Sequence, residues 1–131
     1  MTDEEALAFL DEQRTVICAT HGRDGWPHLM PLWYVVREGT LWAWTYAKSQ
    51  KTKNLERDAR ATLQVETGES YEQLRGLMLR TEAVLHRDPE TVLGFVEELA
   101  ARYAPPGADP ARIRSAADGA RCLRSVGGEP M

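Results

Sequence analysis

The chain has 131 residues, the usual size of one domain, and we expect a single domain over residues 1–131. Its 43% hydrophobic and 27% charged residues are ordinary for a soluble protein with a real core. The formal net charge of −4 argues against a protein specialised for duplex nucleic acid, which usually carries a basic excess.

The first half of the chain alternates between strand-like runs and tight turns. Thr2 and Glu5 have the spacing of a capping box, which predicts a helix at the N-terminus. Apolar runs over about 15–20 and 27–37 and an alternating run over 40–46, separated by turns at 21–25 and 38–39, then predict three strands. Pro31 inside the second strand indicates a bulge or an unpaired edge, because proline has no N–H to donate to a strand ladder.

The second half adds two helices and further strands. Ser49 is a good N-cap for a helix over 50–57, and Asp88 followed by Pro89 marks the start of a longer helix. Further strands are predicted over 61–66, 74–86 and, weakly, 120–126. Residues 118–131 are polar and glycine-rich, so we expect this end to be loose or atypical. Five or six antiparallel strands with few helices predict a small barrel.

The compartment follows from the N-terminus and the cysteines. Residues 1–5 are acidic and lack the apolar stretch of a signal peptide, and no apolar run approaches the roughly 20 residues of a membrane helix. Cys18 lies in an apolar run, and neither it nor Cys122 has a metal-ligand spacing. We expect a cytoplasmic protein with no membrane association and no metal, and a buried, unreactive Cys18 that forms no disulfide with Cys122.

The segment from strand 40–46 into helix 50–57 has the composition of a phosphate site. The first N–H groups of a helix lack intrahelical partners and its dipole end is positive, so this end attracts anions. Hydroxyl, amide and ammonium groups crowd this helix start: Thr45, Lys48, Ser49, Lys51, Lys53 and Asn54. The alternative interpretation is plainer, with Ser49 as a helix cap only and Lys51 and Lys53 on a solvated face.

Four motifs in this chain resemble the FMN-binding split β-barrel family of pyridoxamine 5'-phosphate oxidase, in its flavin- and deazaflavin-dependent oxidoreductase branch. They are A-T-x-G-x-D-G-x-P-H at 19–28, P-L-W-Y at 31–34, T-Y-A-K-S-x-K-x-x-N-L at 45–55 and Y-x-x-L-R-G at 71–76. The resemblance covers residues 5–87. It implies an α+β, mainly β fold, a six-stranded antiparallel split β-barrel with short flanking helices. It also implies a homodimer that binds FMN or the deazaflavin coenzyme F420 in a groove at the interface.

The resemblance also suggests roles for residues outside the phosphate segment. It implies that the irregular backbone at Pro31 faces the cofactor ring. Trp33 and Tyr34 point to opposite faces of their strand, so at most one of them lines the groove, and Trp33 is the candidate. His28 is a candidate for polarising a substrate, although a hydrogen bond within a turn is the favoured interpretation. Tyr71 is a second candidate proton donor. Arg75 is assigned to an anionic group of cofactor or substrate, or alternatively to an ion pair with Glu66 or Glu82 across the sheet.

Trp42 and Trp44 share one face of their predicted strand. Packing in a core or a dimer explains both rings better than stacking on a ligand.

The function predicted first is an oxidoreductase that uses coenzyme F420 to transfer hydride to a small conjugated organic acceptor. No nucleophile–base set or metal cluster stands out, and a cofactor enzyme needs none. The cations Lys48, Lys51, Lys53, Arg57 and Arg60 exceed what one FMN phosphate needs, whereas the F420 tail adds carboxylates. The alternatives are an FMN-dependent oxidoreductase, a flavin or F420 carrier without turnover and, least favoured, a nucleic-acid binder that stacks bases on Trp42 and Trp44.

Overall fold

The structure is a computed structural model that describes residues 1–103, 107, 109–112 and 120–130. Its elements in chain order are α1 (Asp3–Glu12), β1 (Val16–His21), β2 (Pro27–Leu32), β3 (Tyr34–Arg37), β4 (Thr40–Tyr46), α2 (Gln50–Arg57), β5 (Arg60–Thr67), the 3₁₀ helix η1 (Tyr71–Gln73), β6 (Arg75–His86), α3 (Pro89–Tyr103) and β7 (Ala120–Pro130). No helix among the described residues is long and apolar enough to cross a membrane.

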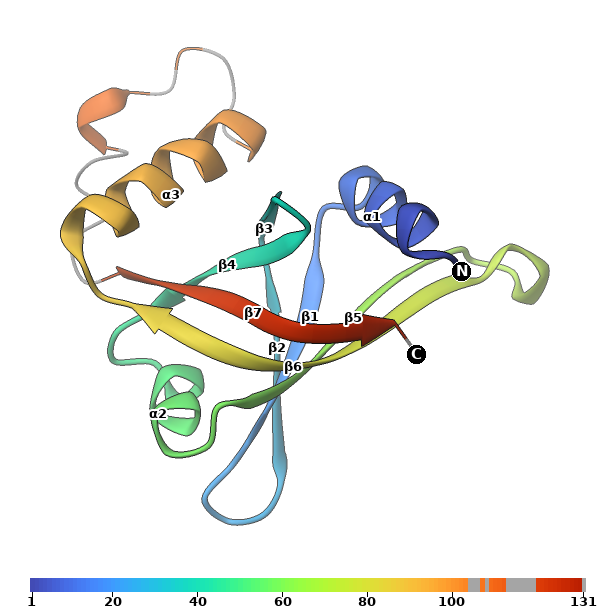
Figure 1. The fold of residues 1–131 in the computed structure, drawn as a ribbon, viewed down its shortest axis with the longest axis horizontal. Helices are drawn as coiled ribbons and strands as arrows, with labels where there is room; N and C mark the ends of the chain where they lie inside the picture. The colour runs from blue at the N-terminus through green and yellow to red at the C-terminus, as the bar shows by residue number, and fades with distance from the viewer. Residues whose placement is uncertain (104–106, 108, 113–119, 131) are drawn as a thin grey trace.

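The strands form one curled antiparallel sheet in the order β2-β1-β5-β6-β7-β4-β3 (Figure 1). The two edge strands, β2 and β3, follow each other in the chain with Trp33 alone between them, so the sheet must curl until its edges meet. This is the predicted α+β half-barrel, with seven strands in place of six. The run predicted as one strand over 27–37 is two strands, because its halves pair with different partners, β1 and β4.

Local signals placed the helices correctly. The capping box of Thr2 and Glu5 is present at α1, and the Ser49 side chain caps α2 by accepting a hydrogen bond from the backbone N–H of Thr52. At α3, Asp88 Oδ2 accepts a hydrogen bond from the backbone N–H of Thr91 at 3.1 Å. The predicted starts of all three helices are therefore confirmed.

The last strand is longer and more central than its sequence indicates. β7 extends to Pro130 and pairs with β4 on one side and β6 on the other. A strand that is hydrogen-bonded on both sides does not need a strong local β pattern. The expectation of a loose end is wrong for residues 120–130, while 118–119 and 131 lie outside the described residues.

Two hydrophobic cores hold the sheet and helices together. One fills the barrel and includes Phe9 of α1, and the other lies between α3 and the outer face of β4 and β7. Trp42 and Trp44 pack against this second core, which confirms that their shared face serves packing. Cys18 and Cys122 are buried and free, so the predicted burial of Cys18 and the absence of a disulfide between the two are confirmed.

We expect the Cys18 thiol to react slowly in the folded protein. Burial raises the pKa of Cys18 to about 11, so the reactive thiolate is a minor form at neutral pH. Labelling with a soluble disulfide reagent, followed by mass spectrometry, should leave the native protein unmodified over the time in which the urea-unfolded chain reacts completely. Labelling of native Cys18 at the unfolded rate would contradict this prediction.

Candidate functional site

A cleft of about 840 Å³ opens where the two edges of the sheet approach each other. This volume is in the usual range for cofactor and small-molecule pockets. The residues that line it come from β2 and the residue after it, from β4, the start of α2 and α3, and from the residue just before β1: Thr15, His28, Met30, Pro31, Leu32, Trp33, Trp44, Tyr46, Ser49, Gln50, Lys51 and Leu99. Most of this lining is apolar or aromatic, and the polar groups gather at α2.

The cleft exists because two strand edges there lack neighbours. β3 pairs with β4 only over Thr40–Ala43, whereas β7 pairs with β4 as far as Tyr46. The end of β4 at Trp44–Tyr46 therefore has a strand partner on one side only. On the opposite wall, β2 pairs with β1 alone, and Pro31 lies in this edge strand, as predicted. Backbone N–H and C=O groups that no strand uses consequently border the cleft.

Three hydroxyl groups fix the turn between β4 and α2. Thr52 Oγ1 donates a hydrogen bond to the carbonyl oxygen of Tyr46 at 2.6 Å. Thr45 Oγ1 lies 2.8 Å from Thr52 Oγ1 and 3.2 Å from Ser49 Oγ. Thr45 and Thr52 are buried beneath the turn, whereas Ser49 also lines the cleft. These hydrogen bonds hold the N-terminus of α2 in place, and Ser49 lies where this N-terminus meets the cleft.

Lys51 is the main electrostatic feature of the cleft. Its side chain lines the cleft although only 6% of the residue is exposed. Burial lowers the pKa of Lys51, and the nearby Cys18 thiol is a weak partner. No acidic residue lines the cleft, and no carboxylate among the described residues forms an ion pair with Lys51. A buried ammonium without a counter-charge is costly, so this position favours an anion.

The other predicted phosphate ligands surround Lys51 without lining the cleft. Lys48 and Lys53 are exposed on the outside of the turn and helix. Asn54 is completely buried, where its Nδ2 donates to Thr20 Oγ1 at 3.1 Å and its Oδ1 accepts from Gln50 Nε2 at 2.8 Å. The Asn54 amide therefore attaches α2 to β1.

His28 lines the cleft from β2 rather than standing in a turn. Its Nδ1 is shielded from water and has no hydrogen-bond partner in the described part of the chain. The favoured interpretation, a hydrogen bond within a turn, is therefore wrong. His28 therefore reaches the cleft by its ring, while its Nδ1 is buried without a hydrogen-bond partner among the described residues.

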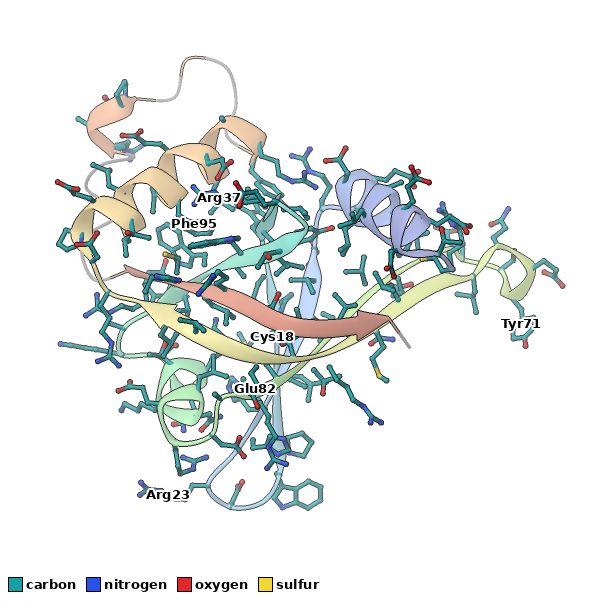
Figure 2. The ribbon with its side chains drawn as sticks, in the orientation of Figure 1. Cys18, Arg23, Arg37, Tyr71, Glu82 and Phe95 are labelled. Atoms are coloured by element: carbon teal, nitrogen blue, oxygen red, sulfur yellow. The ribbon has the colours of Figure 1, made fainter. Side chains whose placement is uncertain are left out.

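Arg75 and Tyr71 lie away from this cleft. Arg75 forms an ion pair with Glu12 at 3.2 Å, not with Glu66 or Glu82, and its guanidinium lies over the Phe9 ring. Tyr71 is 86% exposed in η1, at the tip of the β5–β6 connection (Figure 2). Within one chain, neither side chain lines the cleft.

Several cleft residues carry no local signal of their role. Leu99 belongs to the apolar stripe of α3 and reaches the cleft only because α3 packs over the sheet. Trp44 packs against the second core and also borders the cleft. It reaches the cleft because β3 pairs with β4 only as far as Ala43 and leaves Trp44 without a strand on that side. In the described part of the chain, no group of His, Cys, Asp and Glu side chains is arranged to hold a metal ion.

Comparison with known proteins gives a family and a fold. The family model of pyridoxamine 5'-phosphate oxidase matches residues 2–120. The conserved hypothetical protein Rv2991 from Mycobacterium tuberculosis is 32% identical, with 99% of this chain and 84% of that chain covered and a TM-score of 0.88. A structure named F420 reductase is 20% identical, with 95% and 91% covered and a TM-score of 0.72. The heme storage protein HutZ from Vibrio cholerae is 16% identical, with 98% and 89% covered and a TM-score of 0.74. No curated protein matched the sequence.

Proposed function

Because the chain belongs to the pyridoxamine 5'-phosphate oxidase family, we propose that it is an oxidoreductase that binds a phosphorylated flavin-type cofactor in the cleft between β2 and β4. When bound, such a cofactor supplies the atom that carries the hydride. The observation that carries the proposal is the buried Lys51 side chain, which lines the cleft beside a helix N-terminus and has no carboxylate partner among the described residues. A phosphate supplies the counter-charge that Lys51 lacks.

The residues that line the cleft fit a phosphate at the α2 end and a flat ring along the apolar walls. Ser49 Oγ, the first N–H groups of α2 and Lys51 would hold the phosphate. Thr45 and Asn54 would act beneath them by fixing the turn and the helix, and exposed Lys48 and Lys53 add positive charge nearby. Pro31 and Trp33 border the apolar part of the cleft, where unpaired backbone groups suit the polar edge of a ring.

Within this class we favour coenzyme F420 over FMN. The structure named F420 reductase supports the fold alone, so the preference comes from charge and from the branch that the motifs resemble. Arg57 donates to a backbone carbonyl at 2.5 Å and Arg60 pairs with the neighbouring aspartate at 2.7 Å. Lys48, Lys51 and Lys53 have no ion pair among the described residues and remain for an anionic ligand.

Proton handling is assigned to His28 within one chain. The His28 ring lines the cleft, and His28 is our candidate for holding or delivering a proton to an acceptor bound there. Tyr71 and Arg75 would act on a ligand only in the cleft of another copy, because they lie outside their own. The walls of the cleft exclude water from the ring and orient a small conjugated organic acceptor against it.

Cofactor titration and turnover test the proposed function. We expect the purified protein to bind F420 more tightly than FMN, and pre-reduced F420 to lose its reduced-state absorbance when mixed in stopped flow with a conjugated acceptor. Clear FMN binding without F420 binding would favour the FMN enzyme. Tight binding with no turnover on any acceptor of a broad panel would favour the carrier. Failure to bind either cofactor would contradict the whole proposal.

We also propose a homodimer whose interface covers the open side of the cleft. Large apolar side chains are exposed on and beside β2, where Trp26 is 75% exposed and Leu29 and Met30 are also open. Several large apolar side chains exposed along one edge strand are more than isolated surface residues and favour an interface there. Light scattering at working concentration should give about twice the mass of one chain. The mass of a single chain would contradict the dimer.

A further inference from the structure

We infer that Tyr103, the last residue of α3, is a positioning residue that holds the Trp33 indole in the wall of the cleft, where the indole binds the planar conjugated ring of the ligand. The inference rests on the proposed function, since it concerns the ring of the same cofactor. Tyr103 does not itself line the cleft, so it would affect binding of the ring only through Trp33.

Trp33 lies between the two edge strands, β2 and β3, where the chain passes from one edge of the sheet to the other. It belongs to neither strand, is 53% exposed and lines the cleft. A residue inside a strand takes its side-chain direction from the ladder, but Trp33 lacks this support. The orientation of its ring therefore depends on what packs against it.

The Tyr103 ring supplies that support. The two rings are stacked, with centroids 4.6 Å apart and planes inclined by 7°. The Tyr103 hydroxyl accepts a hydrogen bond from the backbone N–H of Tyr34 at 3.2 Å, and it lies 2.9 Å from the carbonyl oxygens of Tyr34 and Arg14. These contacts attach the hydroxyl to the first residue of β3 and to the segment before β1, so the Tyr103 ring has little freedom to turn.

Arginine side chains also contact the Tyr103 ring that stacks on Trp33. The Arg14 guanidinium carbon lies 4.5 Å from the centroid of the Tyr103 ring, and Arg14 Nη2 donates to the carbonyl oxygen of Arg102 at 2.9 Å. The Arg102 guanidinium carbon lies 5.4 Å from the same centroid, so two arginines contact the Tyr103 ring in addition to the indole. Tyr103 is the one aromatic ring that stacks on Trp33 among the described residues.

The spacing suits a cofactor whose ring is joined to a phosphate by a short chain. Lys51 is close to Cys18, which pairs with Met30 on β2. Trp33 lies three residues beyond Met30, about 10 Å along an extended chain. A phosphate held at Lys51 would leave the conjugated ring of a flavin or deazaflavin within reach of Trp33, since both residues line the same cleft. An electron-rich indole stacks well on such a ring.

A double-mutant cycle on the full chain tests the inference. Trp33→Leu, Tyr103→Leu and the double variant are titrated with F420 and FMN, and with ribitol 5-phosphate, which has the phosphate and chain without the ring. We expect each single variant to raise the Kd of the ring-bearing cofactor by about two- to tenfold and to leave that of ribitol 5-phosphate unchanged. We expect Tyr103→Leu to have no further effect once Trp33 is Leu.

Additive effects in the cycle, or an equal loss for ribitol 5-phosphate, would overturn the inference and leave Tyr103 a structural residue. If Tyr103→Leu does not fold, the cycle is run with Tyr103→Phe, which keeps the ring and removes the hydroxyl contacts. Its smaller increase in Kd should still vanish in the Trp33→Leu background, and persistence there would contradict the inference. Wild-type binding of the cofactors reports separately on the proposed function.

Discussion

Lys51→Met is expected to make the cofactor-free protein more stable and, at the same time, to weaken cofactor binding about tenfold to a hundredfold. Methionine has a similar length and no charge, so it removes a buried ammonium for which the described part of the chain offers no carboxylate partner. The same change removes one charge-assisted hydrogen bond to the phosphate, which contributes about 1.5–3 kcal/mol. Urea unfolding of the free protein and calorimetric titration with F420 and FMN measure the two effects.

Lys53→Met is the matched control. Lys53 lies two residues further along α2, carries the same charge, and is exposed outside the cleft. Its substitution should change the free energy of unfolding by no more than about 0.5 kcal/mol and should lower affinity much less than Lys51→Met. Equal losses of affinity in the two variants would indicate a diffuse charge effect. An unchanged Kd in Lys51→Met would remove Lys51 from the site.

Lys51 also gives cofactor binding a pH dependence of predictable sign. Burial lowers the pKa of Lys51 from the ordinary 10.5 in the free protein, and a bound phosphate moves it back up. Between those two pKa values binding takes up a proton, so affinity falls as pH rises, while below both this group adds no dependence. For the cofactor-free protein, the unfolded state binds more protons than the folded state at pH values between the lowered pKa of Lys51 and 10.5. The free energy of unfolding therefore rises with pH in that range. Titrations from about pH 7 to 10 should show this component in wild type and not in Lys51→Met.

Sequence patterns predicted the elements whose signals are local. Ser49 and Asp88 announce helix starts within a few residues, and both caps form. The break at Trp33 and the length of β7 depend instead on which strands pair. The apolar run 29–36 continues through Trp33 without interruption, and β7 is stabilised by β4 and β6 on its two sides. Neither pairing is encoded within the segment itself.

The candidate site divides in the same way. Ser49 and Lys51 stand together in the sequence and meet at the cleft, so one helix start was enough to predict them. Asn54 belongs to the same motif, but α2 packs against β1 and its amide bonds Thr20. Arg75 pairs with Glu12, which is distant in the chain, and no local pattern predicts that contact. Composition identified the polar groups, and only the packing distinguished those at the cleft from those that support it.

Phe95→Ala is expected to lower the free energy of unfolding by about 3–5 kcal/mol. Phe95 is a completely buried residue of α3 (Figure 2) and belongs to the core that packs α3 against the outer face of the sheet. Truncation removes most of its apolar area and leaves a cavity, because neighbours such as Trp42 and Cys122 are fixed by the sheet. For a domain with about 5–15 kcal/mol of total stability, this is a large fraction.

Two comparisons separate loss of the α3 core from general destabilisation. Phe9→Ala empties the barrel core and should cost a similar amount, while exposed Glu97→Ala on α3 should change stability by no more than about 0.5 kcal/mol. Because α3 brings Leu99 to the cleft and Tyr103 to Trp33, Phe95→Ala should also weaken ring binding below the unfolding transition. Phe9→Ala, on the opposite core, should weaken ring binding less. A loss below about 1 kcal/mol for Phe95→Ala in urea unfolding would mean that α3 is held mainly by its ends.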